Sequence, residues 1–155
     1  MTHPTAYDDL LSQTRGLLTG ERDLLANAAN LTAVLYHSLP EINWVGIYFL
    51  KGNDLVLGPF QGQPACTRIP LGKGVCGTAA SRCETVLVPN VHEFPGHIAC
   101  DAASNSEIVV PLVAGEELLG VLDVDSPVYS RFDEADRRGL ESLVAILLER
   151  SDIAA

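Results

Sequence analysis

The strongest constraint on the fold comes from two pairs of apolar, β-branched segments, each pair joined by a short polar turn. The first pair is WVGIYFL and DLVLGPF, which the turn at residues 51–54 separates. The second pair lies at residues 108–113 and 118–124, on either side of the run Ala-Gly-Glu-Glu. Such segments around turn residues predict β-hairpins with antiparallel strands. Two further short strands are expected at residues 67–69 and 85–88.

Helical patterns flank these strands at both ends of the chain. Helices are expected at residues 7–18, 23–37 and 133–150. The second ends before Pro40, and Ser130 or Asp133 is a candidate N-cap for the third. This order of elements predicts an α+β fold with a mostly antiparallel central sheet and terminal helices packed on one face.

Length and composition indicate one domain, residues 1–155, with a substantial core. The chain is 47% hydrophobic and 19% charged, and its net charge of -10 disfavours nucleic acid and acidic membrane surfaces as partners. No apolar run approaches the roughly 20 residues of a bilayer span, and the N-terminal residues do not resemble a signal peptide. We therefore expect a soluble, cytoplasmic protein.

A loop-rich middle, residues 62–106, holds all four cysteines: Cys66, Cys76, Cys83 and Cys100. Long loops in compact domains are usually functional. Structural zinc sites usually bring cysteines in C-x-x-C pairs, and this chain has none, so no metal is expected. The cytosol keeps thiols reduced, and its disulfides are mostly transient and catalytic. These cysteines therefore suggest thiol chemistry.

A redox cysteine needs a loop position, partial exposure and a second thiol within reach. Cys100 has the loop position, and either Cys66 or Cys76 is a candidate partner. For Cys83 we expect a small buried apolar residue or simple surface exposure.

The run GKGVCG at residues 72–77 matches the dinucleotide-binding pattern G-x-G-x-x-G and precedes an expected helix at residues 78–81. The chain lacks the repeated strand-helix-strand units of a parallel sheet that such a site requires. A glycine-rich turn into a helix is the preferred interpretation, and its N–H groups could hold a small carboxylate.

Three acidic residues accompany the second hairpin: Glu107, Asp123 and Asp125. Residues two apart on a strand share a face, so Asp123 and Asp125 should point together. Like-charged neighbours can keep one such carboxyl protonated as a general acid. Taken alone, the pattern equally fits solvated residues at a strand end.

Three runs carry a family resemblance: PACTRIPLGKGVCGTA at residues 64–79, HIACDAASNSEIVVPL at residues 97–112, and NWVGIY at residues 43–48. They resemble the free methionine-(R)-sulfoxide reductases, which are single GAF domains. The resemblance implies that Cys100 is the catalytic nucleophile, Cys66 the principal resolving cysteine and Cys76 a secondary one. The pocket it implies is lined by Trp44, Tyr48, Glu107, Asp123 and Asp125.

The implied reaction reduces free methionine sulfoxide without a cofactor. Glu107 or Asp125 would deliver a proton to the sulfoxide oxygen while the Cys100 thiolate attacks sulfur. A sulfenic acid and then a disulfide would follow, and the resemblance names thioredoxin as the reductant and allows a homodimer. One alternative is a GAF sensor without catalysis, although 155 residues leave no room for an output domain. Reduction of peptide-bound methionine sulfoxide is another, and it would need an open groove.

Overall fold

The computed structural model describes residues 7–98, 100 and 102–153. Within these ranges, six strands form one sheet in the order β3-β2-β1-β6-β5-β4, and all neighbouring strands are antiparallel. The strands are β1 (Trp44–Lys51), β2 (Asp54–Gln61), β3 (Arg68–Pro70), β4 (Val86–Val88), β5 (Ser106–Ala114) and β6 (Glu117–Ser126). Both expected hairpins, β1-β2 and β5-β6, are confirmed, as is the α+β fold class.

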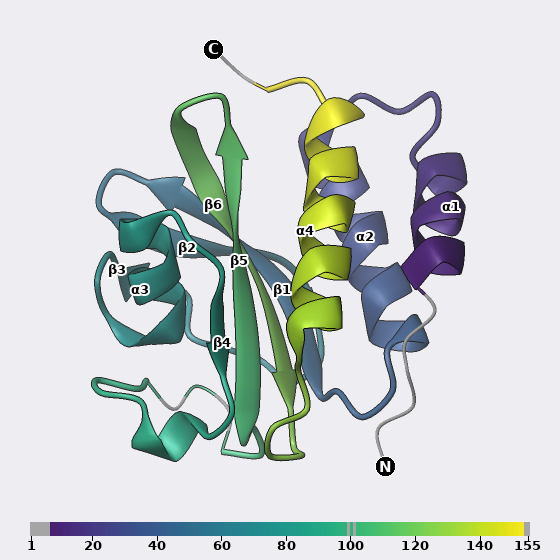
Figure 1. Cartoon of the computed structure of the whole chain (residues 1–155). Helices are drawn as coiled ribbons and strands as arrows, with labels where there is room; N and C mark the ends of the chain where they lie inside the picture. Colours follow the sequence, from purple (N-terminus) through teal and green to yellow (C-terminus); the bar gives the residue numbers. More distant parts are fainter. Residues whose placement is uncertain (1–6, 99, 101, 154–155) are drawn as a thin grey trace.

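Helices cover both faces of this sheet (Figure 1). The helices near the chain ends share one face: α1 (Tyr7–Leu17), α2 (Leu24–Ser38) and α4 (Glu134–Glu149). The opposite face carries α3 (Gly74–Arg82) and the short 3-10 helix η1 (Val91–Glu93). The packing of the terminal helices on one face is therefore confirmed, whereas the start expected for α3 was four residues too late. No helix in the described ranges is both long and apolar enough to span a membrane.

Side chains alternate along the central strands and divide the interior into two apolar clusters. On β1, Val45 and Ile47 join the cluster under α1, α2 and α4, whereas Trp44 and Tyr48 join the cluster under α3. The same alternation sends Ile108 of β5 and Val124 of β6 toward the terminal helices. The residues next to them in sequence therefore point toward α3, which places the acidic side chains of both strands on that face.

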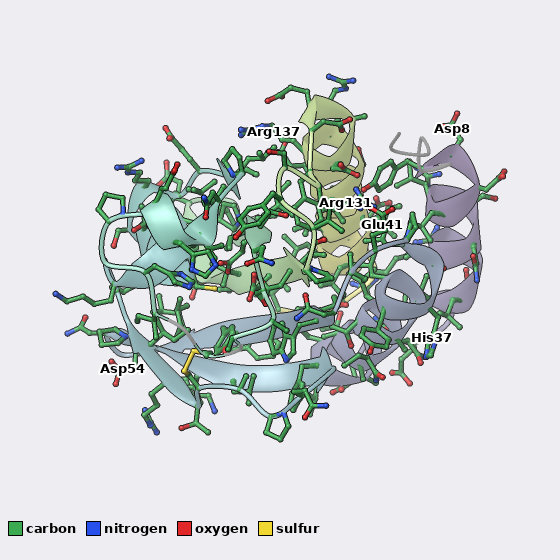
Figure 2. All side chains as sticks on the ribbon, turned by 90° about the horizontal axis from the view of Figure 1, so that it is seen from below. Asp8, His37, Glu41, Asp54, Arg131 and Arg137 are labelled. Atoms are coloured by element: carbon green, nitrogen blue, oxygen red, sulfur yellow. A yellow bond between two sulfur atoms is a disulfide. The ribbon has the colours of Figure 1, made fainter. Side chains whose placement is uncertain are left out.

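A buried polar group joins α1 to the start of α4. Asp133 is the N-cap of α4 and forms a capping box with Asp136, whereas Ser130 has a φ of 54° and is not the cap. Asp136 accepts a hydrogen bond of 2.7 Å from the Tyr7 hydroxyl and pairs with Arg131 at 3.3 Å. Figure 2 shows Arg131 beside α4. Burial and the hydrogen bond to Asp136 raise the pKa of Tyr7, which keeps this donor protonated.

Candidate active site

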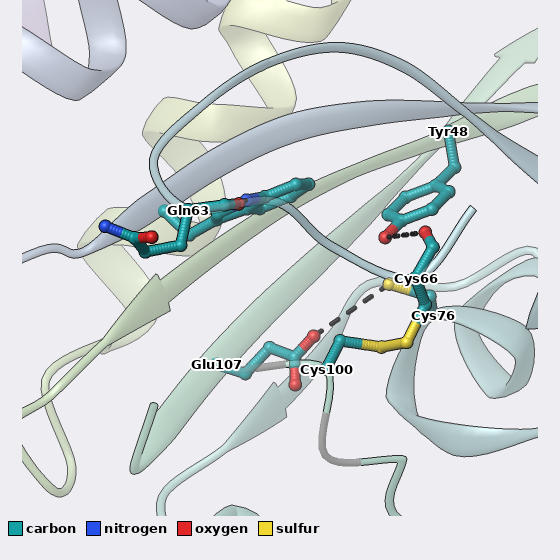
Figure 3. The surroundings of a disulfide bond; sticks show 7 residues. Tyr48, Gln63, Cys66, Cys76, Cys100 and Glu107 are labelled. Carbon is teal, nitrogen blue, oxygen red and sulfur yellow. Dashed lines mark hydrogen bonds between the residues drawn. A yellow bond between two sulfur atoms is a disulfide. The ribbon is translucent and has the colours of Figure 1, made fainter. Parts of the chain in front are cut away.

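A disulfide joins Cys66, in the segment between β2 and β3, to Cys100, in the loop before β5. Their Cα atoms are 5.5 Å apart although 34 positions separate them in sequence (Figure 3). The residue pattern left Cys66 and Cys76 open as partners of Cys100, and the structure pairs Cys66. Cys76 is a buried free thiol, and Cys83 is free and exposed.

A cavity of about 40 Å³ lies beside this disulfide, between α3 and the sheet. It is lined by every pocket residue that the resemblance implied: Trp44, Tyr48, Glu107, Asp123 and Asp125. Cys76 and Cys100 also line it. Four further residues, to which the sequence analysis gave no role, also line the cavity: Lys73, His97, Ile98 and Ser104. Each lies within four positions of a cysteine in the sequence, a proximity that could have identified them.

The aromatic wall of the cavity comes from β1. The Trp44 ring stacks on Phe60, with ring centroids 5.5 Å apart, and on Tyr48, with centroids 6.0 Å apart. Gly46 lies between them on the same face, where a Cβ atom would collide with the indole ring. The missing side chain at Gly46 thus allows the indole to lie along the strand.

The acidic wall comes from adjacent strands. Glu107 on β5 is directly opposite Asp125 on β6, and Asp123 shares their face. All three side chains are buried and line the same cavity, so the predicted convergence of Asp123 and Asp125 is confirmed. Burial raises the pKa of Asp123 well above its ordinary value, and the negative charges of Asp125 and Glu107 raise it further. Asp123 therefore retains a proton at pH values where an exposed aspartate is ionised.

The start of α3 brings Cys76 to the acidic wall. Its Sγ donates to Glu107 Oε2 at 3.9 Å. Burial and the charges of Asp123 and Glu107 raise the pKa of this thiol well above its ordinary value. The ligand atoms of Cys76, Glu107 and Asp123 lie within 4.8 Å of one another, which is close enough to hold a metal ion. A metal would have to displace the protons that Cys76 and Asp123 retain.

The run at residues 72–77 forms the turn into α3 and the first residues of that helix. It contributes Lys73 and Gly74 to the cavity wall. Because the sheet is antiparallel, this turn lacks the parallel strands of a dinucleotide-binding unit. The preferred interpretation, a glycine-rich turn into a helix, is confirmed.

Known proteins share both the sequence and the architecture. The GAF domain family model matches residues 20–147. Free methionine-R-sulfoxide reductase from Escherichia coli (strain K12) is 55% identical, over 91% of this chain and 86% of that protein. The structure of fRMsr of Staphylococcus aureus, in complex with substrate, is 49% identical with a TM-score of 0.92, over 97% of this chain and 98% of that one.

The X-ray structure of free methionine-R-sulfoxide reductase from Neisseria meningitidis, also in complex with its substrate, superposes with a TM-score of 0.90. It is 44% identical and covers 97% of this chain and 94% of its own. The likeness in sequence and fold thus extends over nearly the whole chain. The chain belongs to the free methionine-(R)-sulfoxide reductase family of GAF-domain proteins.

Proposed function

We propose that this chain reduces free methionine (R)-sulfoxide to methionine through a sulfenic acid on Cys100 and a disulfide with Cys66. The observation that carries the proposal is the position of the Cys66–Cys100 disulfide, which closes at the wall of a cavity lined by buried acids and two aromatic rings. A thiol that attacks a ligand in this cavity has both a proton source and a second thiol beside it.

In the first step, the Cys100 thiolate attacks the sulfoxide sulfur while a carboxyl group protonates the sulfoxide oxygen. The oxygen is transferred, so methionine leaves and Cys100 becomes a sulfenic acid. Glu107 and Asp125 are the acids that the family resemblance indicates, and Asp123, whose raised pKa favours its protonated form, belongs to the same cluster. We assign the proton delivery to this cluster as a unit.

In the second step, the Cys66 thiol attacks the sulfenic acid on Cys100, which forms the disulfide and releases water. Cys76 is the secondary resolving cysteine in this scheme. The raised pKa of its thiol disfavours the reactive thiolate. Cys66 is therefore the faster partner of Cys100.

Recognition of the free amino acid follows from the two walls of the cavity. The aromatic rings of Trp44 and Tyr48 offer an apolar surface to the S-methyl group. The ammonium group of the substrate pairs with one of the buried carboxylates and offsets the repulsion among them. A peptide bond at that nitrogen would remove the charge and leave buried acids unpaired.

A dithiol reductant must then reduce the disulfide by thiol exchange, and we assign this role to thioredoxin. The cytoplasm, where thiols are kept reduced, is the matching compartment. A homodimer is a further part of the proposal, and sedimentation equilibrium measures it directly.

The experiment that tests the proposal is thioredoxin-coupled turnover on the separate R and S epimers of free methionine sulfoxide and on the N-acetylated R epimer. We expect turnover on the free R epimer, and at least about a hundredfold lower kcat/KM on the other two because they lose matched polar contacts. Comparable turnover on the N-acetylated compound would contradict this account of the pocket. Binding of the R epimer without formation of methionine would favour a sensor.

A further inference from the structure

We propose that Tyr48 is a positioning residue for disulfide formation: its hydroxyl group holds the segment that carries Cys66 in reach of Cys100. Trp44 assists by holding the same segment at a second point. The inference rests on the proposed function, because it concerns the second step of that reaction. It assigns to the aromatic pair a task beyond lining the pocket.

The segment in question, residues 62–67, links β2 to β3 and contains no helix or strand. Two side chains of β1 donate hydrogen bonds to its backbone, and Figure 3 shows the one from Tyr48. Trp44 Nε1 donates to the carbonyl oxygen of Gln63 at 2.9 Å. The Tyr48 hydroxyl donates to the carbonyl oxygen of Cys66 itself at 3.0 Å. The backbone of Cys66 is thus hydrogen-bonded directly to a side chain of the sheet.

The two donors are well placed to act as fixed points. β1 lies in the interior of the sheet, between β2 and β6. Trp44 and Tyr48 are each only 2% exposed, and their rings stack. Burial and the charge of Asp123 raise the pKa of Tyr48, so its hydroxyl remains a donor throughout the physiological range. The positions of both donors therefore depend on the sheet and not on the loop that they hold.

Holding Cys66 matters because the sulfenic acid on Cys100 has competing fates. Closure consumes the Cys66 hydrogen and the sulfenic hydroxyl as water and forms one sulfur–sulfur bond, whereas a further oxidant converts the sulfenic acid to sulfinic acid. A segment without secondary structure samples many positions unless its backbone groups are bonded. Loss of the Tyr48 hydroxyl leaves the Cys66 carbonyl without this donor and should slow closure about threefold to tenfold.

The test is Tyr48→Phe, which retains the ring and removes only the hydroxyl group. One equivalent of methionine (R)-sulfoxide is added to the reduced full-length chain with dimedone, which labels sulfenic acids, and mass spectrometry then gives the ratio of labelled protein to disulfide. This ratio compares closure with trapping and does not depend on how fast the sulfoxide is reduced. We expect it to rise about threefold to tenfold in Tyr48→Phe. The matched control is Tyr36→Phe on α2, on the other face of the sheet, which should leave the ratio unchanged.

A second comparison shows whether Tyr48 acts through Cys66. In a Cys66→Ser background, Tyr48→Phe should leave dimedone labelling unchanged, because the group that it positions is gone. An unchanged ratio in the single variant, or an equal rise in the Cys66→Ser background, would overturn the inference. If Tyr48→Phe does not fold, Trp44→Phe removes the other donor and should raise the ratio in the same direction. If the wild-type chain forms no methionine, the proposed function is what fails.

Discussion

Cys100 and Cys83 have opposite surroundings, and the difference predicts opposite effects of the same substitution. Cys100 lines the cavity, whereas Cys83 is exposed at the end of α3. Cys100→Ser should reduce methionine formation in a single turnover by at least about a thousandfold, because a hydroxyl group does not replace a thiolate at sulfur. Methionine formation by Cys83→Ser in a single turnover should stay within about a factor of two of that by the wild type. Quenched single-turnover assays measure both, and substantial methionine formation by Cys100→Ser would exclude it as the nucleophile.

The buried carboxyl of Asp123 should reduce the stability of the protein near neutral pH. Its pKa in the folded state is raised above the ordinary value of 3.8. The folded state therefore binds this proton more tightly, so the free energy of unfolding falls as pH rises from 3.8 toward the raised value. Asp123→Asn removes the titration, and we expect the variant to gain stability over wild type as pH increases from about 5 to 8.

Urea unfolding of the oxidised protein at several pH values measures this difference. Glu116→Gln, in the exposed turn between β5 and β6, is the control and should show no such trend. If the difference in free energy of unfolding between Asp123→Asn and wild type did not change over this pH range, Asp123 would be ionised in the folded state. Activity of Asp123→Asn should nevertheless fall, because the acid cluster loses a proton carrier.

At the scale of elements, the contact between α1 and α4 depends on a glycine. The Tyr7 ring lies on Gly139 of α4, where a Cβ atom would collide with it. Gly139→Ala should therefore destabilise the protein by about 1–3 kcal/mol, although alanine is the better helix former. Gly16→Ala in α1 is the matched control, since nothing lies within 4 Å of its added Cβ, and it should stabilise by about 0.4–1 kcal/mol.

Thermal and urea denaturation distinguish these outcomes. In a Tyr7→Ala background the cost of Gly139→Ala should largely disappear, because the colliding ring is gone. A stabilising Gly139→Ala in the Tyr7-containing protein would mean that α1 moves away from α4 at little cost.

The sequence predicted the hairpins and terminal helices well because their patterns are local. Alternating apolar residues and a four-residue turn are sufficient to identify β5 and β6. The start of α3 was misplaced because Gly74 and Gly77 are poor helix formers. Burial of Val75 and Ala79 against the sheet outweighs that propensity, and such tertiary packing has no local signature.

The candidate site was predictable in its residues but not in its geometry. The spacing of Asp123 and Asp125 indicated a shared face, which the structure confirms. The opposition of Glu107 to Asp125 depends on the register of two strands, and burial determines the raised pKa of Asp123. Only the family resemblance favoured Cys66 over Cys76, because positions along a loop do not fix distances across it.

At the scale of the whole molecule, the disulfide closes a loop of the chain that contains α3 and the elements beside it. Its 34-residue separation spans β3, α3, β4 and η1. Chain-entropy arguments for a loop of this length give about 3–4 kcal/mol of added stability. We expect the free energy of unfolding of the oxidised protein to be higher than that of the reduced protein by roughly this amount. Urea denaturation measures the difference. Cys100→Ser, which removes the sulfur that either resolving cysteine would bond, should remove the redox dependence, and equal stabilities of oxidised and reduced wild type would contradict the expectation.

The cavity beside the closed disulfide has a volume of about 40 Å³. At ~10–15 Å³ for each water centre, the cavity of this oxidised state has room for about three water molecules, which is less than an amino acid needs, so the substrate must bind when the disulfide is open and the cavity is wider. The oxidised chain should therefore release methionine and accept no second sulfoxide until the reductant has acted. Initial rates measured against sulfoxide at several fixed reductant concentrations should give parallel double-reciprocal lines, whereas intersecting lines would mean that both substrates bind together. When reductant is scarce, the accumulating oxidised protein would then leave the sulfoxide free in solution instead of sequestering it.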